Sequence, residues 1–362
     1  MNSYERVMAV CKHEKPDVVP AGPFLGNHAA KICKVPLSKY YTDGKVMGEV
    51  LYKAWEEYGY DIIFTHSDGY YISEGMGVET RKEGDDLPIV TRHGISSLLE
   101  AGKIKVPDPY RDGRMSVYLE AIAYLKSKLG GKVAIRGTGT GMFSLVSHIY
   151  GIQELLLDMA EMQYADEDED AKEMEKCFYE LMETCTETLI RFTTAELEAG
   201  ANIIHLGDSL ASLDVVSPQI FRKYIYPYLN KFFTRMKPEF ERHSAFGLLH
   251  ICGNNTAVLD DYASTGADIY EVDYKVDLQE CKQRIGSKMI LMGNVNPVEL
   301  LQDNEEKVKE LCRSCLDVGT QGGGFILGTG CETAINTPME NLKRMVEEAH
   351  NYRYTIKKGY RK

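Results

Sequence analysis

The chain has 362 residues, of which 44% are hydrophobic and 27% are charged, a composition typical of soluble globular proteins. Its formal net charge is −12, with the densest acidic run at 166–170, which opposes binding to the phosphate backbone of a nucleic acid. No apolar run reaches the roughly 18 residues that a membrane span requires. The composition therefore argues against nucleic-acid and membrane partners, and the acidic run is interpreted as a solvated loop or helix start.

The N-terminus and the cysteines indicate the compartment. The first residues include Glu5 and Arg6, and they lack the apolar core and small-residue cleavage site of a secretory signal. Nine cysteines, an odd number scattered along the chain, suit reduced thiols better than disulfide bonds. We therefore expect a cytoplasmic protein with thiols free to bind a metal. A barrel with a few added helices accounts for residues 1–362 as a single domain.

Eight short apolar runs alternate with longer stretches of helical spacing along the chain. In chain order, these runs are 18–24, 61–68, 132–137, 202–208, 247–252, 267–273, 289–295 and 324–330. Eight buried strands that alternate with helices are the pattern of a closed parallel (β/α)8 barrel, or TIM barrel. We therefore predict an α/β fold of this class, with additional N-terminal and inserted helices.

The stretches between the runs predict the helices. They are 45–58, 116–129, 153–165, 171–199, 217–236, 255–265, 278–285, 298–318 and 338–352. Two of them open with a capping hydroxyl followed by proline, at Ser217-Pro218 and Thr337-Pro338, which is a helix start signal. The segment 75–108 is rich in glycine and charge, and it predicts an excursion such as a hairpin before the barrel resumes.

Three metal-binding side chains fall at predicted strand ends. His250 and Cys252 close the fifth run two residues apart, so their side chains share one face, and Cys331 directly follows the eighth run. In a parallel barrel all strand ends open on the same face. Two thiolates and one imidazole suit tetrahedral Zn²⁺ and leave a fourth position open, as in catalytic sites. The sequence therefore predicts a catalytic zinc held by His250, Cys252 and Cys331.

The fourth position and the charge of the site bear on the reaction. Asp273, or else Glu271, ends the sixth run and is a candidate fourth ligand until substrate displaces it, and water is a third candidate. Zinc with two thiolates is formally neutral, so a thiol bound to it loses its proton and remains a nucleophile. Hydrolytic zinc sites more often use histidine and carboxylate ligands. The site is therefore expected to deliver a thiolate to an electrophilic carbon.

Several stretches of the chain resemble one family. They are ERVMAVCKHEKPDVVP, DIIFTHSDGYYISEGMG, SPQIFRKYIYPYLNKFF, HICGN, MGNVNP and GFILGTGCETAINTPMENLKRMV, and they follow one another in the expected order. The chain resembles the uroporphyrinogen decarboxylase superfamily, and within it the zinc-dependent corrinoid methyltransferases, such as methylcobamide:coenzyme M methyltransferases. The resemblance implies a (β/α)8 barrel with a funnel-like site, and its zinc motif falls on His250, Cys252 and Cys331.

The resemblance also implies a reaction, in which a methyl group moves to or from the cobalt of a corrinoid. No cobalamin-binding domain is visible, so methylcobalamin or a related corrinoid would be a co-substrate, carried by a separate small protein or free. Zinc then either activates a thiol acceptor or polarises a methylated donor, and the thiolate-rich ligand set favours the thiol. Methyl ethers, methylated thiols and methylated amines are the alternative donors.

A cofactor-free decarboxylase is the competing function within the same resemblance. Its catalytic carboxylate would fall on Asp68 in DIIFTHSD, but its arginine-rich motif for substrate carboxylates is replaced here by AGPFLGNHAAK. We therefore consider decarboxylation less favoured, and a binding relative without turnover is a third interpretation. His66 and Asp68 are expected to line the substrate pocket or, alternatively, to cap the strand end as polar groups.

Overall fold

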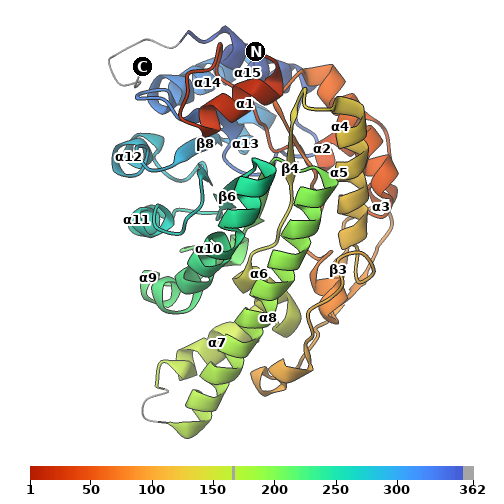
Figure 1. The fold of residues 1–362 in the computed structure, drawn as a ribbon, viewed down its shortest axis with the longest axis vertical. Helices are drawn as coiled ribbons and strands as arrows, with labels where there is room; N and C mark the ends of the chain where they lie inside the picture. The colour runs from red at the N-terminus through yellow and green to blue at the C-terminus, as the bar shows by residue number, and fades with distance from the viewer. Residues whose placement is uncertain (165–167, 354–362) are drawn as a thin grey trace.

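The computed structural model describes residues 1–164 and 168–353, and a parallel β-sheet lies at its centre (Figure 1). Seven strands follow the order β1-β4-β5-β6-β7-β8-β9, and each pairs in parallel with the next. The strands are β1 (Ile62–Phe64), β4 (Ala134–Gly137), β5 (Ile203–Gly207), β6 (Phe246–His250), β7 (Ile269–Glu271), β8 (Ile290–Val295) and β9 (Phe325–Thr329). They coincide with seven of the eight predicted runs.

The remaining predicted run closes the sheet into a barrel. The Gly22 N–H donates to the Leu327 carbonyl of β9 at 2.8 Å, and the Leu327 N–H donates to the Pro20 carbonyl at 2.9 Å. On the other side, the Asp61 N–H donates to the Ala21 carbonyl at 2.7 Å, just before β1. Only a single bridge forms here, at Ala21, because the prolines on either side of it have no N–H to extend a ladder. The predicted barrel class is confirmed, with this first strand reduced to a bridge.

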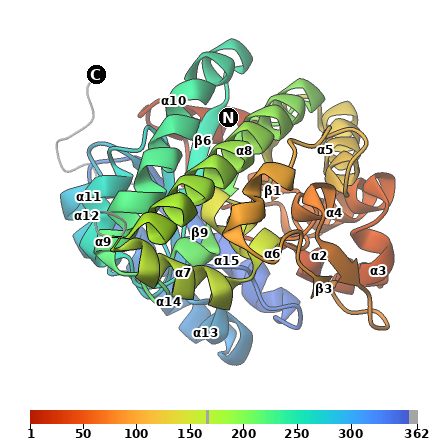
Figure 2. The ribbon, with the colours of Figure 1, turned by 90° about the horizontal axis from the view of Figure 1, so that it is seen from below.

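Helices surround the strands on the outside, as the view in Figure 2 shows. The longer ones are α4 (Gly44–Tyr58), α5 (Met115–Leu129), α7 (Ile152–Met162), α8 (Glu169–Ala199), α10 (Tyr226–His243), α14 (Glu305–Gly319) and α15 (Met339–Asn351). The Asp168 carboxylate caps α8 by accepting the N–H groups of Asp170 and Ala171. The described part of the acidic run is therefore a helix start, as interpreted, and the rest of the run, 166–167, lies outside the described residues.

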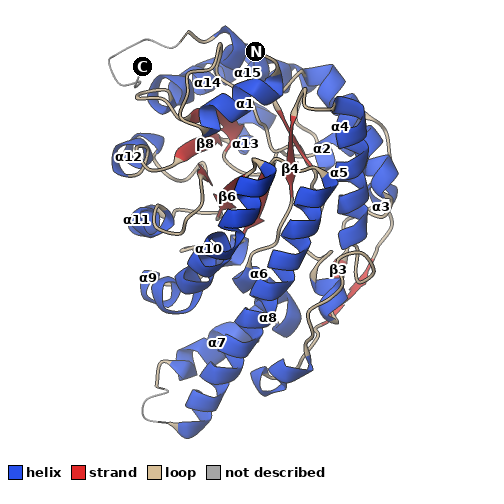
Figure 3. Cartoon of the chain, viewed as in Figure 1, coloured by secondary structure: helices blue, strands red, loops and turns tan. Residues whose placement is uncertain are grey.

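Shorter elements fill the connections between strands (Figure 3). The short helices are α1 (Ser3–Cys11), α2 (Asn27–Ile32), α3 (Leu37–Tyr40), α6 (Met142–Tyr150), α9 (Pro218–Ile220), α11 (Leu259–Tyr262), α12 (Leu278–Arg284) and α13 (Pro297–Gln302). Short 3-10 helices lie at Ser73–Met76, Leu98–Lys103, Ser209–Ala211 and Thr256–Val258, and a π turn, Phe221–Ile225, joins α9 to α10. The additional helices predicted from the sequence are thus present. Within the described ranges, no helix combines the length and apolar character that a bilayer crossing requires.

Three predicted segments differ in detail from the structure. The helix predicted at 298–318 is two helices, because the Asn304 side chain caps a new start at α14. The helix predicted at 255–265 is reduced to one 3-10 turn and α11. The excursion at 75–108 contains an antiparallel hairpin, as expected, built from β2 (Glu79–Arg81) and β3 (Ile89–Arg92).

A buried carboxylate joins the two ends of the chain to the barrel. The Asp61 side chain is fully buried, and it accepts hydrogen bonds from Arg6 of α1 at 2.6 Å and from the Ala21 N–H at 2.8 Å. The Nε2 atom of His350 in α15 lies 2.8 Å from the same carboxylate. The carboxylate therefore ties α1, the closing segment and α15 to the start of β1.

We expect Asp61→Ala to lower the free energy of unfolding by about 3 kcal/mol, because it removes the buried partner of the Arg6 guanidinium, which keeps only the exposed Asp17, and leaves the buried Ala21 N–H without a partner. Denaturant unfolding followed by circular dichroism measures this change. Asp17→Asn is the matched control, since Asp17 also pairs with Arg6 but is 39% exposed, and it should cost less than about 1 kcal/mol. Equal losses in the two variants would contradict the role given to Asp61.

Candidate metal centre

The ends of β6 and β9 bring three metal-binding side chains together. His250 is the last residue of β6, Cys252 follows two residues later, and Cys331 lies two residues beyond β9. The Nε2 atom of His250 is 3.4 Å from the Sγ atom of Cys252, which is 3.9 Å from the Sγ atom of Cys331. All three donor atoms lie within 4.8 Å of one another. The predicted triad therefore meets at one point on the barrel rim.

The two distances from the Cys252 sulfur fit the edges of a single tetrahedral ion, and the third pair, His250 and Cys331, lies within 4.8 Å. Bonds of about 2.1 Å to nitrogen and 2.3 Å to sulfur give tetrahedral edges of roughly 3.6 Å for N···S and 3.8 Å for S···S. The observed 3.4 Å and 3.9 Å differ from these edges by a few tenths of an ångström at most. The three residues also line a cavity of about 930 Å³, so a fourth ligand position can face substrate.

The donor atoms also influence one another's protonation. The Cys331 thiol next to Cys252 lowers the pKa of Cys252 despite its burial, with His250 adding to this effect, and the pKa of Cys331 rises in turn. Burial lowers the pKa of His250, but the Cys252 charge and Glu271 outweigh it and raise that pKa to about 9. A thiolate therefore forms in this cluster at neutral pH, which is the form of cysteine that binds a metal.

A second layer of buried groups fixes the orientation of His250. Its Nδ1 atom lies 3.1 Å from the Glu271 carbonyl, which leaves Nε2 free to face the sulfurs. The Glu271 carboxylate accepts two hydrogen bonds from Arg136, at 2.7 Å and 2.6 Å, and both side chains are almost completely buried. Sequence reasoning missed Arg136, although a lone arginine inside an apolar strand is a signal of a buried ion pair.

The two carboxylates predicted as fourth ligands are engaged elsewhere. The Asp273 side chain accepts the backbone N–H groups of Gly253 and Lys275, both at 2.8 Å, and so holds the loops that follow β6 and β7. Glu271 is bound by Arg136. Among the residues that the structure describes, the clustered donor set contains only His250, Cys252 and Cys331. Neither carboxylate lies within it.

Comparison with known proteins identifies the family. The family model described as Uroporphyrinogen decarboxylase (URO-D) matches residues 2–352. The chain belongs to the uroporphyrinogen decarboxylase family. The resemblance predicted from the sequence is thereby confirmed. Both branches of the family occur among its relatives.

Methyltransferases are prominent among these relatives. The methylcobamide:CoM methyltransferase MtbA of Methanosarcina acetivorans is 32% identical over 285 residues, covering 77% of this chain and 76% of that protein. A solved methyltransferase from Methanosarcina mazei superimposes with a TM-score of 0.82 at 27% identity, covering 96% of this chain and 98% of the other. A uroporphyrinogen decarboxylase from Carboxydothermus hydrogenoformans is 26% identical and covers 88% of this chain and 84% of its own length. The predicted enzyme class, a corrinoid-dependent methyltransferase, agrees with the name of the first, and the second is named as a methyltransferase.

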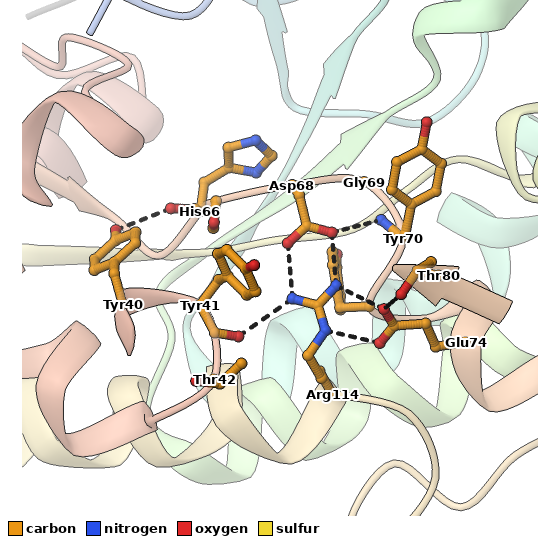
Figure 4. Close-up of polar contacts among 12 residues, drawn as sticks. Tyr40, Tyr41, Thr42, His66, Asp68, Gly69, Tyr70, Glu74, Thr80 and Arg114 are labelled. Carbon is orange, nitrogen blue, oxygen red and sulfur yellow. Dashed lines mark hydrogen bonds and ion pairs between the residues drawn. The ribbon is translucent and has the colours of Figure 1, made fainter. Parts of the chain in front are cut away.

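In this uroporphyrinogen decarboxylase family member, Asp68 lines the cavity but is held in an ion-pair network (Figure 4). Arg114 donates to both carboxylate oxygens of Asp68 at 2.8 Å, and it also pairs with Glu74 at 2.7 Å. The Tyr70 N–H donates to Asp68 at 2.9 Å, and Arg114 reaches the Tyr41 carbonyl at 3.2 Å. Asp68 therefore faces the cavity and anchors the segment after β1, and its contact with a substrate stays a prediction.

His66 also faces the cavity, as a neutral group. Its Nδ1 atom is 3.3 Å from the Thr138 hydroxyl, and its ring stacks on Phe64 with centroids 5.1 Å apart. Burial lowers the pKa of His66 to about 4, so the imidazole carries no charge at neutral pH. The structure thus places His66 and Asp68 in the pocket with the three metal-binding residues.

We expect Arg114→Met to lower the free energy of unfolding by about 3 kcal/mol, because two partly or fully buried carboxylates lose their partner. Thermal and urea unfolding measure this loss. Arg111→Met, three residues away in the same loop, is the control, since the Arg111 side chain is 84% exposed and its stability should not change. A fully stable Arg114→Met would show that the network does not hold this segment.

Proposed function

We propose that the chain is a zinc enzyme that moves a methyl group between a corrinoid and a small thiol or methylated substrate. The observation that carries this proposal is the clustering of the His250, Cys252 and Cys331 donor atoms within 4.8 Å of one another, in the lining of the cavity at the barrel mouth. The names of the relatives support the corrinoid as co-substrate. In this proposal His250, Cys252 and Cys331 hold the ion, and His66 and Asp68 line the substrate pocket beside it.

Zinc would supply a Lewis acid that keeps a bound thiol deprotonated at neutral pH. The residues of the chain set the geometry and exclude water. The Glu271 carbonyl orients His250, and the Ser209 hydroxyl, 3.3 Å from the Cys252 sulfur, stabilises the thiolate charge. Leu87, Pro88 and Val90 of the β2–β3 hairpin form an apolar wall of the cavity. A nucleophilic sulfur in this cavity is shielded from bulk solvent.

The transfer balances without an external oxidant or reductant. The substrate thiol loses its proton to solvent, and its sulfur forms a bond to the methyl carbon as the cobalt–carbon bond of the methylcorrinoid breaks. The bonding pair stays on cobalt, which leaves as Co(I). The corrinoid, free or on a small carrier protein, would approach the open end of the barrel. The reverse direction, from a methylated ether, thiol or amine to Co(I), uses the same site.

The cofactor-free decarboxylase is less well supported by the contacts. Its candidate carboxylate, Asp68, has both oxygens occupied by Arg114. A decarboxylase would also give no role to two cysteines and a histidine whose donor atoms share one point on the rim. In the methyl-transfer proposal, the pairing of Asp68 with Arg114 holds the wall of the pocket, and the clustered cysteines and histidine hold the metal.

We expect the purified protein to hold one zinc per chain, and Cys252→Ala and Cys331→Ala to lose it on dialysis, because two ligands cannot retain the ion. Metal analysis by mass spectrometry measures this content. Cys33→Ala is the control, since Cys33 is also partly exposed but contacts only the Val50 carbonyl at 3.7 Å. A wild-type protein without zinc after growth in zinc-supplemented medium would refute the metal assignment.

We expect the zinc-loaded protein to demethylate methylcobalamin in the presence of a thiol, and Cys331→Ala to slow this reaction at least about a hundredfold, because the thiol is no longer deprotonated by the metal. The absorbance change of the corrinoid gives the rate, and circular dichroism checks that the variant is folded. A panel of methylated ethers, thiols and amines with Co(I) corrinoid tests the reverse direction. Unchanged rates in Cys331→Ala would exclude zinc from the reaction.

A further inference from the structure

The cavity beside the metal-binding residues has no positively charged lining. Among the described residues that form its wall there is no lysine and no arginine. Its ionisable side chains are instead carboxylates, Asp68, Glu154 and Glu332, together with imidazoles. Proteins that bind sulfonate, phosphate or carboxylate groups generally place a guanidinium or an ammonium against them. The lining therefore lacks the usual partner of an anionic substrate.

Among the described residues, two buried guanidinium groups lie near the cavity, and both are already neutralised. Arg114 is 13% exposed and is shared between the carboxylates of Asp68 and Glu74. Arg136 is 1% exposed, is bound by Glu271, and lies 3.9 Å from the centroid of the Phe64 ring. Each would have to leave a buried ion pair before it could meet a substrate anion. Breaking such a pair leaves an uncompensated buried charge.

Two helix N-termini lie at the cavity. That of α7 has no side-chain cap and carries the Glu154 carboxylate in its first turn, and that of α6 is occupied. Helix α6 begins at Met142, and Ser144 and Ser147 of its first turns line the cavity. The N–H groups at such an end attract anions. Here the fully buried Asp208 accepts the N–H groups of Phe143 at 3.1 Å and Ser144 at 2.8 Å, and the Ser144 hydroxyl at 2.7 Å. The protein's own carboxylate thus takes the place of a substrate anion.

Two of the imidazoles in the wall, His66 and His148, supply no positive charge, and His250 would be a neutral ligand in the proposed zinc site. Burial lowers the pKa of His66 and that of His148 to about 4, so both rings are neutral near pH 7. The His66 ring lies against Phe64 and Phe24, and His148 lies against Tyr70 with centroids 4.7 Å apart. This part of the wall is aromatic and hydrogen-bonding, without charge.

Resting on the proposed methyl transfer, we propose that the small substrate of this cavity carries no anionic group. Neutral or cationic thiols, or their methylated forms, would bind, whereas thiols with a sulfonate or carboxylate, coenzyme M included, would be rejected. An anion would lose its hydration in a cavity lined by carboxylates and gain no cation in return. This chain would then differ in acceptor from the relatives that are named for coenzyme M.

The test compares two thiols of equal carbon length on the zinc-loaded wild-type protein. They are 2-mercaptoethanol, which is neutral, and 2-mercaptoethanesulfonate, which is coenzyme M. We expect calorimetric titration without corrinoid to show at least about tenfold tighter binding of the neutral thiol. With methylcobalamin present, we expect kcat/KM also to be higher for the neutral thiol than for the sulfonate. No preference, or a preference for the sulfonate, would overturn the inference. If the wild-type protein holds no zinc, or transfers no methyl group to either thiol, the proposed function is refuted instead. The calorimetric comparison of the two thiols is made without corrinoid, so it distinguishes this failure from a failure of the charge inference.

An introduced cation gives a second test of the charge argument. Leu210 lines the cavity and follows Ser209, which contacts the Cys252 sulfur. We expect Leu210→Lys to raise the ratio of sulfonate to neutral kcat/KM at least about tenfold over the matched Leu210→Gln variant, which has a polar side chain without charge. Equal ratios in the two folded variants would show that charge does not govern the preference.

Discussion

The site depends on the closure of the sheet. Cys331 and Cys252 are 79 residues apart, and β7 and β8 lie between their strands, yet their sulfurs are 3.9 Å apart. Only a strongly curved sheet brings side chains from such strands to one point, and closure maintains that curvature. The bonds of the Ala21 segment to β9 and to Asp61 complete the ring. The buried Asp61 carboxylate, just before β1, is thus part of the ring that brings His250, Cys252 and Cys331 together.

Paired charges form the wall behind these atoms. Two such groups hold loops and strands in place, Arg136 with Glu271 and Arg114 with Asp68 and Glu74. Each guanidinium makes two hydrogen bonds to a carboxylate, which fixes the orientation of the pair. Buried pairs of this kind add little net stability compared with an apolar core. They do fix position, and no lysine or arginine is among the described residues that line the cavity. The same contacts therefore orient His250 and set the electrostatic character of the pocket.

The sequence predicted the triad because its signals are local. A histidine and a cysteine two residues apart share a strand face, and Cys331 directly follows another apolar run, so the barrel class alone places them on one rim. The partners of Arg136, Arg114 and Asp273 were not predictable in this way. Which carboxylate meets which guanidinium, or which backbone N–H, depends on strand register and loop paths. Strand parity made Asp273 a candidate ligand, but it could not reveal that the backbone N–H groups of Gly253 and Lys275 occupy its carboxylate.

The charge at the proposed zinc site explains why an unpaired lysine or arginine in the cavity wall would matter. Zinc with two thiolates is neutral, so a bound substrate thiolate makes the site negative by one charge. A sulfonate on the same two-carbon thiol would lie about 5 Å from that sulfur, and at an effective dielectric constant near 20 the repulsion is about 3 kcal/mol. This energy corresponds to roughly a hundredfold in binding. A guanidinium in the wall would offset it, but Arg114 and Arg136 are each bound by carboxylates. In the proposed site, the ion pairs of Arg114 and Arg136 would therefore also be the contacts that turn an anionic thiol away.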